Sequence, residues 1–215
     1  MKSMRPAPLL AVLLAAACVT AAAAPPNDAV TPANAVTTAG NANDDEAGDE
    51  ARVRGKYLVT VAGCNDCHTP WTMGPAGPHP DMTRMLSGHP QDVALPPPPA
   101  AEGPWLVSAA ATNTAWSGPW GVSFTANLTP HLETGLGRWT LRNFVDTIRS
   151  GRHLGRGRPI LPPMPIPMYK HFTDEDLQAI YLYLQSIPPI DNRVPEPLPP
   201  PNAKGTQQIE PVRDE

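Results

Sequence analysis

Apolar residues recur at helical spacing in three stretches of the chain. In the first stretch, residues 51–62, the apolar side chains of Val53, Tyr57, Leu58 and Val61 form one stripe beside basic residues, which is typical of an amphipathic helix. Gly63 follows directly and predicts the end of this helix.

The other two stretches carry clear helix boundaries. Thr140 predicts the N-cap of a second helix with apolar residues at i, i+3, i+4 and i+7, and Gly151 predicts its C-terminal end. Thr173, with Asp176 three residues later, predicts the start of a third helix, which stops before the prolines at 188–189.

Residues 69–137 show no sustained helical or alternating period, and the chain contains 30 prolines, about three times the usual share of roughly 5%. So long a loop counts against a compact domain unless a buried prosthetic group supplies part of the core. We therefore predict an all-α fold of about three main helices, with long loops rich in proline and glycine.

The N-terminus has the layout of an export signal, predicted at residues 1–24. Lys2 and Arg5 precede an apolar run at 9–17, which is too short for a membrane span, and small residues follow at 21–24. The run before Cys18 also resembles a bacterial lipoprotein processing site, in which Cys18 would become the lipidated first residue.

Three further segments follow from composition. We expect a disordered acidic tether at 25–50, a folded domain at 51–192 and a proline-rich disordered tail at 193–215. The formal charge is −4, and the six acidic residues of segment 25–50 account for the excess. A neutral remainder with few aromatics argues against a nucleic-acid partner.

The motif Cys64-Asn65-Asp66-Cys67-His68 carries the chemistry. Two thiols separated by two residues can add to the two vinyl groups of haem, and the adjacent histidine then binds the iron. Such attachment in bacteria occurs outside the cytoplasmic membrane, in agreement with the export signal. A single motif predicts one covalent haem c, with Cys64 and Cys67 as attachment points and His68 as an iron ligand.

Two other readings of this motif are open. A zinc site would need further ligands, for which His79, His89 and His131 are candidates. A thioredoxin-type dithiol normally follows a strand and opens a helix, whereas this pair follows a predicted helix and enters loops.

The second iron ligand is predicted in the proline-rich segment 162–168. Met164 is the predicted ligand and Met168 the alternative. A thioether ligand raises the reduction potential, which suits an electron carrier. If neither methionine binds, the site is either open to small ligands or closed by a histidine, for which the candidates are His79, His89, His131, His153 and His171.

A local basic region lies between Arg138 and Arg158, with six of the fourteen basic residues that follow residue 50. It is either a solvated surface, a docking surface or a source of donors to the haem propionates. For the last role the candidates are Arg138 and the indole N–H of Trp139.

Several motifs together resemble the class I cytochromes c, and more narrowly the single-haem cytochrome c subunits associated with periplasmic dehydrogenases. The resemblance implies that the first and last helices cross, with Gly55 close to an aromatic such as Tyr181, and that Met164 is the ligand. The role of the segment between Trp71 and Phe124 stays open. The resemblance rests on residues 55–58, 63–70, 127–130, 135–140, 163–165 and 173–177.

The predicted function is that of an electron carrier and not an enzyme. We expect a periplasmic protein, free or lipid-anchored, that shuttles single electrons between a dehydrogenase-type donor and a respiratory acceptor. One alternative is the haem subunit of an oxidoreductase with its own substrate site, although no acid/base pair stands out near the motif. A haem-based ligand sensor is another, but such sensors normally carry an output domain, and the sequence indicates none.

Overall fold

The computed structural model describes residues 42–98 and 105–200 of the 215-residue chain. These residues fall within one compact unit. The predicted signal with Cys18, residues 25–41 of the predicted tether and residues 201–215 of the predicted tail lie outside the described residues. No helix in the described ranges is long and apolar enough to cross a membrane.

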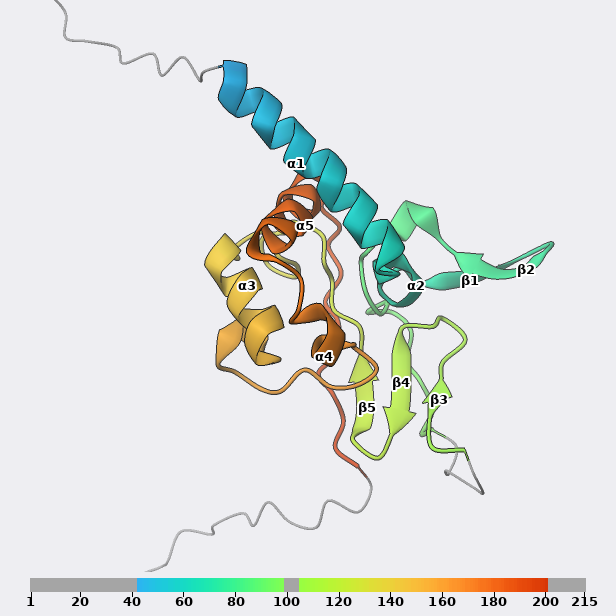
Figure 1. Cartoon of the computed structure of the whole chain (residues 1–215). Helices are drawn as coiled ribbons and strands as arrows, with labels where there is room; N and C mark the ends of the chain where they lie inside the picture. Colours follow the sequence, from blue (N-terminus) through green and yellow to red (C-terminus); the bar gives the residue numbers. More distant parts are fainter. Residues whose placement is uncertain (1–41, 99–104, 201–215) are drawn as a thin grey trace, which may run out of the picture. The chain divides into compact units, whose positions relative to one another are not determined.

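The described residues form short elements joined by long irregular segments (Figure 1). In chain order these are α1 (Ala42–Val61), α2 (Cys64–His68), β1 (Trp71–Gly74), β2 (Gly77–Pro80), η1 (Met82–Arg84), β3 (Ser108–Ala109), β4 (Ala115–Gly118), β5 (Gly121–Phe124), α3 (Leu141–Ser150), η2 (His153–Gly155), α4 (Ile166–Tyr169) and α5 (Asp174–Ser186).

The predicted all-α fold is wrong, because the segment between α2 and α3 forms two small antiparallel sheets and the fold is mixed α/β. One sheet pairs β1 with β2, and the other has the order β3-β4-β5. Gly77 and Gly121, at the starts of β2 and β5, have φ of 110° and 96°, a region that favours glycine. Each strand is two to four residues long, too short to leave an alternating pattern in the sequence.

The second and third predicted helices are confirmed at their caps. Thr140 and Asn143 form a capping box at the start of α3, and Gly151 ends the helix in the left-handed conformation. The hydroxyl of Thr173 accepts a hydrogen bond from the backbone N–H of Asp176 at 3.1 Å.

The first helix begins earlier than predicted. Residues 42–50, which composition assigns to the tether, are the first half of α1. Arg52 pairs with Asp49 at 2.5 Å, one turn away, and such pairs support a helix of polar composition.

The buried face of α1 also differs from the predicted stripe. Leu58 and Val59 are buried, whereas Val53 and Tyr57 are 71% and 61% exposed. The buried face is centred on Gly55, where α1 crosses α5 (Figure 1). The crossing is confirmed, but the aromatic beside Gly55 is Tyr183 instead of Tyr181.

After α5 the chain runs back in extended form towards β5. We call residues 190–198 the strap. Leu198 and Val122 exchange two backbone hydrogen bonds of 2.9 Å, and a Cβ on Gly121 would lie 2.0 Å from the Leu198 oxygen. Residues 193–200 therefore pack on the domain, although their proline content assigns them to the tail.

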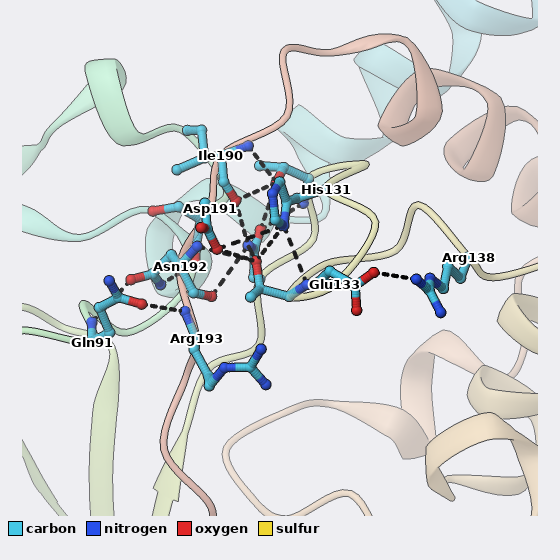
Figure 2. Close-up of polar contacts among 12 residues, drawn as sticks. Gln91, His131, Glu133, Arg138, Ile190, Asp191, Asn192 and Arg193 are labelled. Carbon is cyan, nitrogen blue, oxygen red and sulfur yellow. Dashed lines mark hydrogen bonds and ion pairs between the residues drawn. The ribbon is translucent and has the colours of Figure 1, made fainter.

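A buried asparagine anchors the other end of the strap. The side chain of Asn192, 1% exposed, donates to the carbonyl oxygens of Ser87 at 2.7 Å and His89 at 2.8 Å. Its own oxygen accepts from the backbone N–H of Gln91 at 2.9 Å, and the N–H of Arg193 donates to the Gln91 side chain at 2.8 Å (Figure 2).

Candidate haem site

The cysteine–histidine motif is itself a short helix, α2. Gly63 separates it from α1 and adopts the left-handed conformation with φ of 70°, so the chain turns at once from α1 into α2. Residues three and four apart share one face of a helix, so Cys64, Cys67 and His68 lie on the same side of α2.

The imidazole of His68 is held by the loop after β5. Its Nδ1 lies 2.8 Å from the carbonyl oxygen of Ala126, and the residue is only 8% exposed. A carbonyl can only accept, so Nδ1 carries the proton and Nε2 keeps its lone pair. Burial lowers the pKa of His68, which favours the neutral ring that metal binding requires.

Thr69 fixes the end of α2 to the chain that follows η1. It is fully buried, and its hydroxyl donates to the Asn65 side chain and accepts from the backbone N–H of Leu86, both at 2.9 Å. The carbonyl of His68 accepts from Gly88 N–H at 2.8 Å. These bonds leave the position of His68 little freedom.

Cys64 and Cys67 are not joined by a disulfide. Burial raises the pKa of the Cys64 thiol to about 11, and burial followed by the charge of Asp66 raises the pKa of Cys67. Both groups are therefore thiols at neutral pH.

One cavity of about 550 Å³ brings the predicted residues together, within the range of about 300–1,000 Å³ typical of cofactor sites. Apolar side chains of α3 and α5, such as Phe144 and Leu177, line it. The predicted site residues also line it: Cys64, Cys67, His68, Arg138, Trp139 and Met164.

The two candidate methionines occupy different environments. Met164 lines the cavity and packs against the hydrophobic core. Met168, one turn into α4, is 72% exposed and does not line the cavity. The geometry thus places a thioether beside the motif only at Met164.

The predicted propionate donors already have partners. Arg138 is paired with Glu133, as Figure 2 shows. Trp139 packs edge-on against His153, with ring centroids 5.2 Å apart.

Among the histidines considered as alternative ligands, only His153 lines the cavity. His89 is fully buried elsewhere, with ring nitrogens 2.9 Å from the Thr114 hydroxyl and 3.2 Å from the Val93 oxygen. His131 is bonded to the Thr134 hydroxyl at 2.8 Å. Within the described ranges, no three His, Cys, Asp or Glu side chains cluster as metal ligands.

Sequence reasoning missed several residues of the lining. Arg158 lies in the basic region noted above, which was a partial signal. Tyr169 of α4, and Arg193 and Glu196 of the strap, also line the cavity, but nothing in their local sequence indicates this.

Comparison with known proteins agrees with this site. No family model matches the chain. Over 161 residues it is 27% identical to the cytochrome c subunit of gluconate 2-dehydrogenase from Pantoea cypripedii, covering 72% of this chain and 29% of that protein. Over 144 residues it is 30% identical to the cytochrome subunit of fructose dehydrogenase from Gluconobacter japonicus, covering 66% and 23% respectively.

The chain is a homologue of the cytochrome c subunits of dehydrogenases. This relationship implies haem c and supports a role as an electron-transfer subunit. A shorter match, 37% identical over 78 residues, covers 36% of this cytochrome c homologue and 6% of a nicotinate dehydrogenase subunit from Pseudomonas putida. The chain thus spans less than a third of the length of each of these relatives.

Proposed function

We propose that this chain binds one covalent haem c and transfers single electrons without catalysing a reaction of its own. Cys64 and Cys67 form the two thioether links, and His68 and Met164 are the axial ligands. The observation that carries the proposal is the bond between His68 Nδ1 and the Ala126 carbonyl. It leaves Nε2 free in a cavity that also holds two thiols and a thioether.

A bound haem c supplies reversible one-electron exchange between ferrous and ferric iron. The Ala126 carbonyl holds the His68 ring in one orientation, as backbone acceptors commonly do for metal-binding histidines. The prolines on both sides of Met164 restrict its backbone, and the apolar lining keeps water from the ligands. Arg138 and Trp139 provide donors for the propionates.

We propose a dehydrogenase as electron donor and a respiratory protein as acceptor. The names of the relatives support the first assignment, since those proteins are subunits of dehydrogenases. We also propose export, either with cleavage near residues 21–24 or with lipidation of Cys18. Mass spectrometry of the N-terminus of the exported protein distinguishes these two outcomes, and a retained N-terminal Met1 contradicts export.

The axial ligands are tested by expressing the protein with a haem c maturation system. We expect covalent haem and, in the oxidised protein, the near-infrared charge-transfer band of methionine–iron ligation. Met164→Ala abolishes this band. Met168→Ala is the matched control and retains it, because Met168 is exposed. A wild-type protein without covalent haem, or with high-spin iron that binds small ligands, contradicts the proposal.

A further inference from the structure

Three arginines line the cavity, and they differ in what neutralises them. Arg138 is paired with Glu133, and Arg158 lies 3.4 Å from Glu196. Arg193 lines the same cavity but forms no ion pair with any carboxylate in the described part of the chain. Arg193 is therefore the cation of this cavity whose charge is least compensated.

The backbone at Arg193 is held firmly. Its N–H donates to the Gln91 side chain at 2.8 Å, and the neighbouring Asn192 is buried and bonded to two carbonyls. Figure 2 shows the side chain of Arg193 extending away from this network. The prolines at 195 and 197 stiffen the chain that follows. A base fixed in this way reduces the conformational entropy lost when the guanidinium binds an anion.

We propose that Arg193 is a haem-binding residue that neutralises a propionate, and that Asn192 is its positioning residue. The inference rests on the proposed function, because the propionates are the only anionic groups of haem. The guanidinium presents a planar set of donors that matches a carboxylate. The strap thus contributes to the electrostatics of the haem and does more than cover the cavity.

Other charged and titratable groups face the same space, so the test must separate them. They come from α2, α4, the segments on both sides of α3, and the strap: Cys64, Cys67, His68, Glu133, Arg138, His153, Arg158, Tyr169 and Glu196. All of them remain unchanged when only residue 193 is varied, so a difference between variants at this position reports on Arg193.

The experiment is a spectroelectrochemical titration of the full-length matured protein across pH, comparing wild type with Arg193→Gln and Arg193→Lys. Lys56→Gln is the control, since it also removes one positive charge from an exposed side chain but lies outside the cavity. In Arg193→Gln we expect a lower midpoint potential, because a nearby cation favours the reduced state. We also expect the propionate-linked pH transition to rise by about one unit, the lower end of the usual effect of an adjacent arginine.

Arg193→Lys keeps the charge, so it should restore most of the wild-type potential and pH transition. The proposal is overturned if Arg193→Gln, with covalent haem and an intact methionine–iron band, gives the same pH profile as Lys56→Gln. Absence of covalent haem in the wild type overturns the proposed function and this inference with it. The haem content of each sample therefore distinguishes the two failures.

Discussion

Gly55 of α1 lies directly against the backbone of Ala179 of α5, so that a Cβ on Gly55 would be 2.0 Å from the Ala179 carbonyl oxygen. This contact is between main chains, and no side-chain rotation can relieve it. The closeness of the two helices thus depends on the absence of a side chain at residue 55.

We predict that Gly55→Ala lowers the free energy of unfolding by about 3 kcal/mol, since overpacking that forces backbone shifts has costs of this order. Gly48→Ala in the same helix is the control. Its Cβ would meet nothing closer than 3.5 Å, so the gain in helix propensity should stabilise the protein by about 0.5–1 kcal/mol. Urea titration of both variants measures the difference, and equal effects would contradict the contact.

Asn192→Asp should destabilise the protein by about 3 kcal/mol at neutral pH. The change replaces a donor with an oxygen that faces the carbonyls of Ser87 and His89. The loss should be smaller at pH 5 than at pH 8, because burial among acceptors raises the pKa of the new carboxyl and its protonated form can donate again.

Asn143→Asp provides the matched comparison. The Asn143 side-chain oxygen accepts from the backbone N–H of Thr140 at 3.2 Å and from its hydroxyl at 3.0 Å. A carboxylate accepts both bonds, so this variant should stay within about 0.5 kcal/mol of wild type. If both substitutions have similar effects on chemical denaturation, Asn192 does not anchor the strap as described.

The stability of the domain should fall in mild acid partly because of His89. Burial, the largest cause, lowers the pKa of His89 below its ordinary value of 6.5. The folded state therefore binds the proton less readily than the unfolded state. Stability that is present above the ordinary pKa is lost as pH falls through the lower folded-state pKa.

His89→Gln removes this proton uptake, so its stability should decline less than that of wild type between pH 7 and pH 5. Denaturant unfolding at several pH values measures the two slopes. His68 and His153, whose pKa values burial also lowers, contribute equally to both proteins. Parallel curves would show that His89 takes up its proton without opposing the fold.

Local features of this chain could be predicted from sequence because their physics is local. The caps at Thr140 and Thr173 depend on residues three positions away, and the motif at 64–68 contains its own chemistry. The prolines around Met164 distinguish it from a simple core residue. The structure places Met164 in the cavity and Met168 in solvent.

Features that depend on distant partners could not be predicted. Asn192 appears in the sequence as one polar residue ahead of a proline-rich run, and its role depends on carbonyls about a hundred residues earlier. The buried face of α1 was misjudged for a related reason. Gly55 contributes to that face through close backbone contact, which a pattern of hydrophobic side chains does not register.

The strap also bears on where this domain can be cut. A fragment trimmed to residues 51–192, the boundary that composition suggests, would keep Cys64, His68 and Met164. It would lose the wall of the cavity formed by residues 193–197 and the pairing of Leu198 with Val122. Such a fragment would retain the ligands yet expose the interior of the site to water, so a truncation at this boundary would change the protein that it was meant to isolate.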